Sequence, residues 1–267
     1  MYKAVFTDMD GTLLKGNHTV SHTTIQVIQK LLAEGILIIP ISARPLHGML
    51  PITKNIFPDD IPVVSLNGSY IYHKGKIIYQ VDMPLPSVEM IHTLSEKFPV
   101  SAMYYSQMDW YSTEATAAVK KEQRITPVPI TIQGFEKTSK IWEQKQTGPN
   151  KILIAGEPHV ILDIEKELLQ TFGSGLNIYK SQPKYVEAMH PDASKTNAMR
   201  FIMDMYGIRQ NETIAIGDNY NDVGMIEAAG MGVAMGNAPE EIKSSAGFVT
   251  DSNNNDGVAK ALTHFFK

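Results

Sequence analysis

The 267-residue chain contains no cysteine, and this absence removes a whole group of functions. Without thiols the protein cannot form disulfides, use a thiolate nucleophile or bind zinc through cysteine. The chain also lacks a long hydrophobic run, because the densest one, ILIIPI at 36–41, is far shorter than the ~20 residues of a membrane-spanning helix. No basic and apolar leader precedes the first strand, so the sequence predicts a soluble cytoplasmic protein without a membrane partner.

The charge of the chain argues against nucleic acid as a partner. It has 24 Lys and Arg against 28 Asp and Glu, a formal net charge of -4 at pH 7. Proteins that bind nucleic acid through charge are usually basic, so we expect no nucleic-acid partner. The hydrophobic fraction of 43% is ordinary for a globular protein, and the length allows one large domain or two smaller ones. The sequence does not indicate an oligomeric state.

Strand and helix signals alternate in the first and last thirds of the chain. KAVFTD (3–8) and ILIIPIS (36–42) read as buried strands on either side of a helix that Ser21 can cap. SYIYH and KIIYQVDM, joined by Lys74 and Gly75, read as a hairpin. TIAIGD (213–218) and GVAMG (232–236) flank another helix, and the spacing of Asn237 and Glu240 predicts a capping box. These units predict an α/β fold with a doubly wound, mainly parallel sheet.

The middle of the chain has a different pattern. AMYYS (102–106) and WYSTE (110–114) read as short strands, and VILDIEKELLQTF (160–172) reads as a helix. We interpret residues 84–188 as an α+β domain inserted into a core formed by residues 1–83 and 189–267. Its aromatic residues could form a wall that faces the substrate, although such residues more often belong to the sheet core. These residues are Tyr104, Tyr105, Trp110 and Tyr111.

Polar side chains follow the strands at several separate places in the sequence. The carboxyl ends of parallel strands meet at one edge of a sheet, so we expect these side chains to converge on a ligand. The candidates are Asp8 and Asp10 in DMDGTLL, Ser42, Ala43 and Arg44 in ISAR, Lys195 at a helix start, and Asp218, Asn221 and Asp222 in GDNYND. Acids placed this close together in a buried site indicate that a cation or a reacting group lies nearby.

These motifs resemble a known family. DMDGTLL, Ser42, Lys195 and GDNYND are similar to the four motifs of the haloacid dehalogenase (HAD) superfamily of phosphatases. SLNGSYI (65–71) and the position of the insert resemble the Cof-type members, which carry a type IIB cap. The resemblance implies a Rossmann-like core and a phosphatase that uses Mg²⁺ to hydrolyse small phosphomonoesters, such as sugar phosphates or related metabolites. The insert would then close over the site and select the substrate.

The same resemblance implies roles for individual residues. The Asp8 carboxylate, the Asp10 carbonyl and the Asp218 carboxylate would bind Mg²⁺, with Asp222 just outside. Asp8 would attack phosphorus, because a free aspartate has a pKa of ~3.9 and is ionised at neutral pH. Asp10, two residues along an extended chain, would serve as acid and then base, with its turn permitted by Gly11. The groups expected to hold phosphate or substrate are the Met9 and Ala43 amides, Ser42, Arg44, Lys195 and Asn221.

Several alternatives remain open from the residues alone. Asp218 and Asp222 could simply cap a helix, and Arg44 or Asn67 could serve a turn rather than a substrate. A phosphoryl mutase could use the same aspartyl-phosphate, and a phospho-accepting signalling module also combines acids, a hydroxyl and a lysine. The second acid at Asp10 argues against the signalling module. His18 and His22 are not expected to bind a metal together, because Ser21 between them reads as a helix cap.

Overall fold

The structure is a computed structural model that describes residues 1–125 and 129–267. These residues divide into two compact units. The first unit comprises Met1–Arg44, Met49–Ile78 and Ser194–Lys267, and the second comprises Pro45–Gly48 and Tyr79–Ala193. The second unit extends slightly beyond the predicted insert at both ends. One reason is that Asp82, ahead of the insert, accepts hydrogen bonds from Thr147 (2.7 Å) and Asn150 (2.9 Å) within it.

The first unit is built on a twisted sheet whose described strands follow the order β14-β13-β12-β1-β2-β3-β4-β5. The strands are β1 (Ala4–Asp8), β2 (Leu37–Ile41), β3 (Val63–Ser65), β4 (Tyr70–His73), β5 (Lys76–Gln80), β12 (Thr213–Gly217), β13 (Met231–Ala234) and β14 (Phe248–Val249). From β14 to β3 all neighbours are parallel, and β3 pairs with β4 in the antiparallel sense. The predicted doubly wound α/β fold is therefore confirmed.

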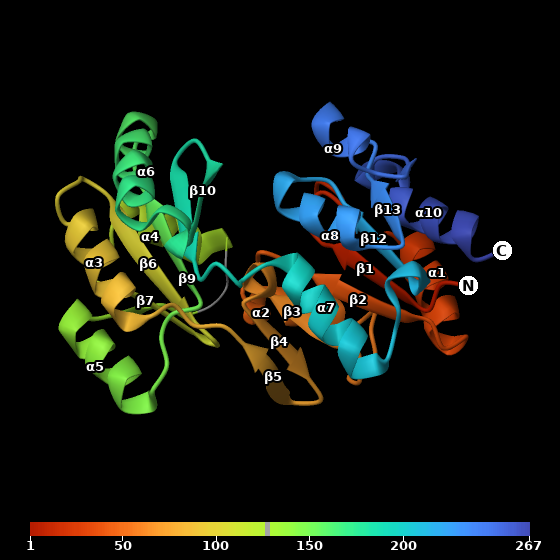
Figure 1. Cartoon of the computed structure of the whole chain (residues 1–267), viewed down its shortest axis with the longest axis horizontal. Helices are drawn as coiled ribbons and strands as arrows, with labels where there is room; N and C mark the ends of the chain where they lie inside the picture. The colour runs from red at the N-terminus through yellow and green to blue at the C-terminus, as the bar shows by residue number, and fades with distance from the viewer. Residues whose placement is uncertain (126–128) are drawn as a thin grey trace. The chain divides into compact units, whose positions relative to one another are not determined.

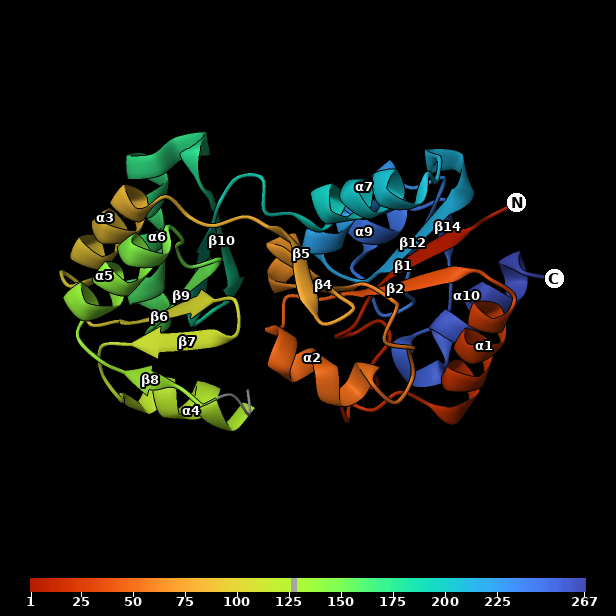
Figure 2. The same cartoon turned by 90° about the horizontal axis from the view of Figure 1, so that it is seen from below.

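Helices cover both faces of this sheet, as Figure 2 shows for α7 and α9 on one side and α1 and α10 on the other. The helices that lie wholly or mostly in the first unit are α1 (His22–Ala33), α2 (Leu46–Thr53), α7 (Lys195–Tyr206), α8 (Val223–Ala228), α9 (Glu240–Ser244) and α10 (Gly257–Phe265). Short 3-10 turns occur at η1 (Leu66–Gly68), η3 (Gln210–Glu212), η4 (Tyr220–Asp222) and η5 (Asn253–Asn255). With both faces covered, β1 and β12 are buried along their whole length, which explains why apolar and polar residues do not alternate along them.

Two serines begin helices as side-chain caps. The Ser21 hydroxyl accepts a hydrogen bond from the Thr24 amide, so α1 begins at His22 as the sequence predicts. Ser194 caps α7 in the same way by accepting from the Asn197 amide. The predicted capping box at Asn237 is wrong, because α9 begins only at Glu240 and Pro239 occupies the cap position. The Asn237 side chain instead donates to the Gly11 carbonyl and to Asp218, and its Oδ1 accepts from the Asn253 amide of η5.

The second unit contains its own sheet (Figure 1). The order of its described strands is β10-β11-β9-β6-β7-β8. Its strands are β6 (Ser101–Ser106), β7 (Asp109–Ser112), β8 (Thr131–Ile132), β9 (Lys151–Ala155), β10 (Asn177–Gln182) and β11 (Tyr185–Met189). Its helices are α3 (Leu85–Ser95), α4 (Ala117–Ile125), α5 (Phe135–Lys145) and α6 (Pro158–Phe172), with the turn η2 (Gly173–Gly175). Mixed strands and helices of this kind match the α+β pattern expected for the insert.

The four aromatic residues of the predicted wall are all buried, but they fall into two groups. Tyr104 and Tyr111 belong to a hydrophobic cluster that includes Trp142 of α5 and residues of α3 and α6. Successive side chains of a strand point to opposite faces of the sheet, so Tyr105 and Trp110 lie on the other face. There their rings stack with centroids 5.5 Å apart. For Tyr104 and Tyr111 the structure therefore favours a role in the core.

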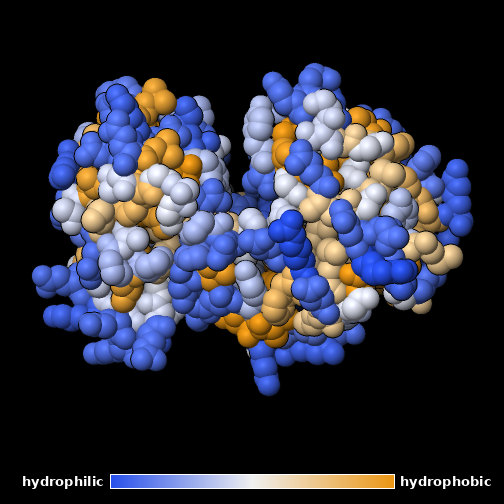
Figure 3. Space-filling model, in the orientation of Figure 1, coloured by the Kyte–Doolittle hydropathy of each residue, from blue (hydrophilic) through white to orange (hydrophobic). Residues whose placement is uncertain are grey.

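The hydropathy of the surface and the lengths of the helices are ordinary for a chain with a hydrophobic fraction of 43%. In the view of Figure 3, hydrophilic residues cover much of the visible face and hydrophobic residues occur among them in smaller areas. Among the described residues, no helix combines the length and the apolar character needed to cross a membrane.

Candidate active site

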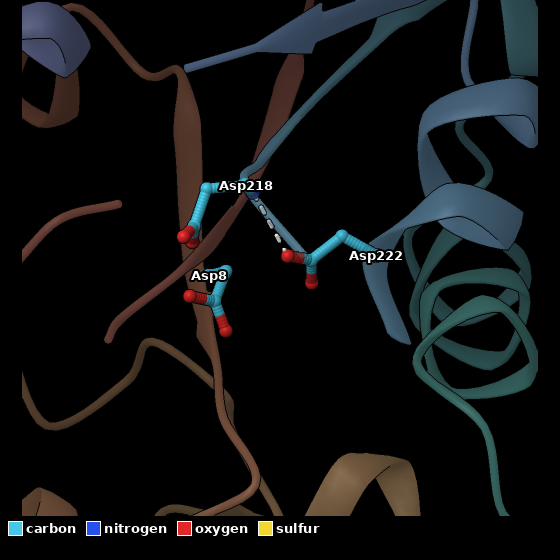
Figure 4. Close-up of side chains that lie close together, drawn as sticks. All are labelled: Asp8, Asp218 and Asp222. Atoms are coloured by element: carbon cyan, nitrogen blue, oxygen red, sulfur yellow. Dashed lines mark hydrogen bonds between the residues drawn. The ribbon is translucent and has the colours of Figure 1, made fainter. Parts of the chain in front are cut away.

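Three carboxylates meet at the carboxyl edge of the first unit's sheet (Figure 4). Asp8 is the last residue of β1, and Asp218 directly follows β12, the parallel neighbour of β1. Asp222 ends the turn η4. Each of the three offers an oxygen within 4.8 Å of the oxygens of the other two. The strand order thus places together residues that are far apart in the sequence.

Lys195 supplies a positive charge inside this cluster of acids. It is the first residue of α7, only 2% of it is exposed, and its ammonium donates hydrogen bonds to Asp8 Oδ1 and, over 2.5 Å, to Asp222 Oδ1. A cation at a helix N-terminus is unfavourable to the helix dipole, and the two carboxylates offset that cost. The start of α7 lies close to η1 because Gly68 has no side chain. A Cβ at Gly68 would collide with the carbonyl oxygen of Ser194.

Asp222 makes two kinds of contact in the structure, one with backbone amides and one with Lys195. Its Oδ2 accepts hydrogen bonds from the backbone amides of Asp218 and Asn219, each at 3.0 Å. Its Oδ1 accepts from Lys195. Asp222 therefore completes the capping box of η4, whose cap residue is Asn219, and at the same time fixes the lysine beside Asp8.

The Asp218 carboxylate is held by residues that the sequence analysis missed. The Thr12 hydroxyl donates to its Oδ1 at 2.8 Å, and the Asn237 side-chain amide lies 3.3 Å from its Oδ2. Asn237 also donates to the Gly11 carbonyl, at 2.9 Å. Gly11 has a φ of +84°, and a Cβ there would collide with Asp218. Thr12 could have been noticed as part of DMDGT, whereas Asn237 was misread as a helix cap.

Burial dominates the ionisation of this cluster. It raises the pKa of Asp8 well above its ordinary value, while Lys195 lowers that pKa and Asp222 raises it further. Burial also raises the pKa of Asp218 to about 6, although the Thr12 hydrogen bond opposes the shift. For Lys195 burial lowers the pKa, but Asp222 and Asp8 outweigh it and keep the ammonium charged. The expectation that Asp8 ionises like a free aspartate is therefore incomplete, because the pocket itself disfavours a third negative charge.

The Asp10 side chain lies outside this acidic cluster. Its carboxylate is 44% exposed and accepts two hydrogen bonds from Arg44, at 2.7 Å from Nε and at 2.6 Å from Nη2. His18 Nδ1 lies 3.1 Å from the same Nη2. The sequence placed Asp10 and Arg44 at the site separately, and the structure joins them as a pair.

The remaining candidates surround the same edge of the sheet. Ser42 is 1% exposed, and its hydroxyl accepts a hydrogen bond from the Arg44 amide at 3.1 Å. Asn221 donates from its side chain to Asn67 Oδ1 at 2.9 Å, and Asn67 adopts a left-handed conformation with φ 56°. The Met9 side chain is fully buried in the core, so only its backbone could contact a ligand.

The chemistry of the cluster fits a hard divalent cation. Its three carboxylates and one ammonium leave two negative charges when all are ionised. Carboxylate oxygens are the ligands that Mg²⁺ and Ca²⁺ prefer. A dication would favour the ionised forms of Asp8 and Asp218, whose pKa values are raised mainly by burial.

The family of the chain follows from comparison with known proteins. The family model described as haloacid dehalogenase-like hydrolase matches residues 5–262, almost the whole chain. The chain belongs to this family. In this HAD-like hydrolase, the motifs that contain Asp8 and Asp218 lie at the carboxyl edge of the sheet.

Relatives and solved structures narrow the position within the family. A protein of Haemophilus influenzae named "Putative phosphatase" is 39% identical, over 100% of this chain and 99% of the relative. A "Pyridoxal phosphate phosphatase" of Escherichia coli is 26% identical, covering 97% of each chain. A solved sugar phosphatase of HAD subclass IIB, BT4131, superimposes with a TM-score of 0.84 at 26% identity, over 98% of each chain. The predicted Cof-type resemblance is confirmed, and this HAD-like hydrolase is a phosphatase.

Membership of this enzyme family also decides one of the open alternatives. A phospho-accepting signalling module would not need to hydrolyse a substrate, whereas the relatives of this HAD-like hydrolase carry phosphatase names. The enzymatic interpretation is therefore the correct one.

Proposed function

We propose that the protein is a Mg²⁺-dependent phosphatase that hydrolyses small phosphomonoesters through an aspartyl-phosphate on Asp8. The observation that carries the proposal is the buried Lys195 ammonium, held between Asp8 and Asp222 with Asp218 in the same cluster. A lysine in this position can bind phosphoryl oxygens and keep the nucleophile oriented.

The residues that would hold Mg²⁺ are the carboxylates of Asp8 and Asp218 and the backbone carbonyl of Asp10, with Asp222 outside. When bound, Mg²⁺ supplies positive charge that lets an anionic nucleophile approach an anionic phosphoryl group. Thr12 and Asn237 fix the Asp218 carboxylate, and Asp222 fixes the turn that carries Asp218. The carboxylates are therefore oriented by neighbouring side chains before any ligand binds.

The proposed chemistry uses two acids in succession. An Asp8 oxygen attacks phosphorus, the bond from phosphorus to the leaving oxygen breaks, and Asp10 donates a proton to that oxygen. Asp10 then takes a proton from water as the water attacks the phosphorus of the aspartyl-phosphate, which releases inorganic phosphate and restores Asp8. Lys195, the Ser42 hydroxyl and the Met9 and Ala43 amides hold the non-reacting phosphoryl oxygens, and Asn221 contacts the phosphate or its water.

Sugar phosphates are the substrate class we favour, because BT4131 is named a sugar phosphatase. We propose that residues 84–188 select among such substrates, since this insert contributes none of the three acids of the cluster.

The test is a panel of phosphorylated metabolites, including sugar phosphates, pyridoxal phosphate and nucleoside monophosphates. In the presence of Mg²⁺ we expect at least one sugar phosphate to release inorganic phosphate. One phosphate should be released for each dephosphorylated product. Turnover should be lost when a chelator is added. Transfer of the phosphoryl group to a second sugar without free phosphate would instead identify a mutase. Undiminished turnover in chelator would contradict the role of the cation.

Cation binding should weaken in acid. The pKa of Asp218 is raised to about 6, and a carboxylate must lose its proton before it can ligate Mg²⁺. Below this pKa the cation competes with a proton, so affinity falls as the pH decreases. Between pH 7.5 and pH 5 we expect the apparent Kd for Mg²⁺ to increase by about tenfold or more. The measurement is the rise in melting temperature with added Mg²⁺ at each pH. An unchanged Kd would contradict the assignment.

A further inference from the structure

Asp10 and Arg44 form a paired contact that the reaction described so far does not explain. Arg44 directs its Nε and Nη2 at the two oxygens of the Asp10 carboxylate, over 2.7 and 2.6 Å. This arrangement is the two-point match between a planar guanidinium and a carboxylate, which fixes orientation as well as distance. A lysine could not reproduce it, because an ammonium is a single point of charge.

Hydrogen bonds to neighbouring segments fix the backbone of Arg44. The Arg44 amide donates to the Ser42 hydroxyl at 3.1 Å. The Arg44 carbonyl accepts from the Ser65 hydroxyl at 2.8 Å and from the Leu66 amide at 3.1 Å. The Arg44 backbone is thus anchored to the end of β3 and the start of η1, and 25% of the Arg44 side chain is exposed. The guanidinium is a fixed partner for Asp10, whose side chain would otherwise be free to rotate at a half-exposed position.

His18 approaches the pair from a third segment of the chain. Its Nδ1 lies 3.1 Å from Arg44 Nη2 and 3.7 Å from Asp10 Oδ1. The loop that carries it is closed by hydrogen bonds between the backbones of Lys15 and Thr19 and of His18 and Lys15, at 2.9 and 2.8 Å. His18 has a left-handed backbone with φ 60°, so this loop has a defined conformation. The pair therefore has a third neighbour from a hydrogen-bonded loop, on a side that stays open to solvent, since the His18 and Asp10 side chains are 69% and 44% exposed.

We infer that Arg44 is a positioning residue that orients the carboxylate of Asp10, and not a ligand of the substrate phosphate. The inference rests on the proposed function, in which Asp10 exchanges protons with the leaving oxygen and with water. Nε and Nη2 form one edge of the guanidinium, and both are directed at Asp10, so this edge is not available to a phosphate. A proton-transfer group displaced by about 1 Å can lose on the order of 10²-fold in rate, so an arginine that fixes Asp10 acts on kcat.

The test is a double-mutant cycle between Arg44 and Asp10, measured with a phosphomonoester that the wild-type protein hydrolyses. Arg44→Ala should reduce kcat by about 10- to 100-fold and change KM and inhibition by inorganic phosphate less than about threefold. Adding Arg44→Ala to Asp10→Ala should cause no further loss, because the residue to be positioned is already absent. Arg44→Lys should recover only part of kcat, and Arg200→Ala, at an exposed arginine of α7, is the matched control.

A phosphate-binding arginine would give the opposite pattern. KM and the inhibition constant for phosphate would increase at least tenfold, and the losses from Arg44→Ala and Asp10→Ala would multiply; either result overturns the inference. The melting temperatures of the same four proteins separate this question from the proposed function. If the wild-type protein shows no turnover, coupled losses of melting temperature would still support the contact between the two side chains. Losses that simply add would contradict it.

Discussion

Asp8→Asn should abolish hydrolysis of an aryl phosphate while the protein stays folded. An amide cannot form the aspartyl-phosphate, so we expect a loss of about 10⁴-fold or more in kcat. Because burial raises the pKa of Asp8, a neutral side chain at this position should cost little stability when no cation is bound. The measurements are phosphate release over long incubation and the melting temperature of the variant.

The control for Asp8→Asn is a matched substitution, Asp204→Asn, at an exposed aspartate on α7. It changes charge by the same amount and should leave turnover within a factor of two. Mass spectrometry of the Asp8→Asn protein excludes recovery of activity through deamidation back to aspartate. Turnover retained by an intact Asp8→Asn protein would refute the proposed nucleophile.

Lys195→Met should reduce both stability and catalysis. The substitution leaves Asp8 and Asp222 buried without their shared ammonium partner, a change that typically costs about 3–5 kcal/mol. It also removes a group proposed to bind phosphoryl oxygens, which should reduce kcat/KM by about 10²–10³-fold. Thermal or denaturant unfolding and steady-state kinetics measure the two losses separately.

The stability loss of Lys195→Met should depend on pH and on Mg²⁺. Lys195 lowers the pKa of Asp8, so its removal raises that pKa further above the unfolded value of ~3.9. The folded variant then binds more protons than the unfolded chain, and its stability falls as the pH increases. The loss should therefore be smaller at pH 5 than at pH 8, and Mg²⁺ should raise the melting temperature of the variant more than that of the wild type.

Lys260→Met is the control for this comparison. Lys260 pairs with Asp251 at 2.6 Å, but both side chains are more than half exposed. An exposed ion pair contributes about 1 kcal/mol or less, so this variant should lose little stability at either pH. Equal losses at Lys195 and Lys260, or a loss at Lys195 that does not vary with pH, would contradict the burial argument.

The sequence could predict the first unit because its signals are local. Stretches such as KAVFTD and TIAIGD, in which consecutive apolar residues do not alternate with polar ones, predict strands that are covered on both faces, and the structure has β1 and β12 there. The capping serine before α1 was also readable, since Ser21 acts on the amide three residues later. The spacing of Asn237 and Glu240 wrongly predicted a capping box. The Asn237 side chain is instead hydrogen-bonded to Gly11, more than two hundred residues away in the sequence.

The sequence alone determined which residue types stand at the carboxyl ends of β1, β2 and β12, and in a parallel sheet those ends share one edge. Only the tertiary structure decided how their side chains pair, because hydrogen bonds between distant residues depend on how each loop leaves its strand. Lys195 thus contacts Asp8 and Asp222, whereas Asp10, two residues after Asp8, turns to Arg44. Burial of the cluster, which sets the pKa of Asp8, is likewise a property of the assembled fold and cannot be read from the order of residues.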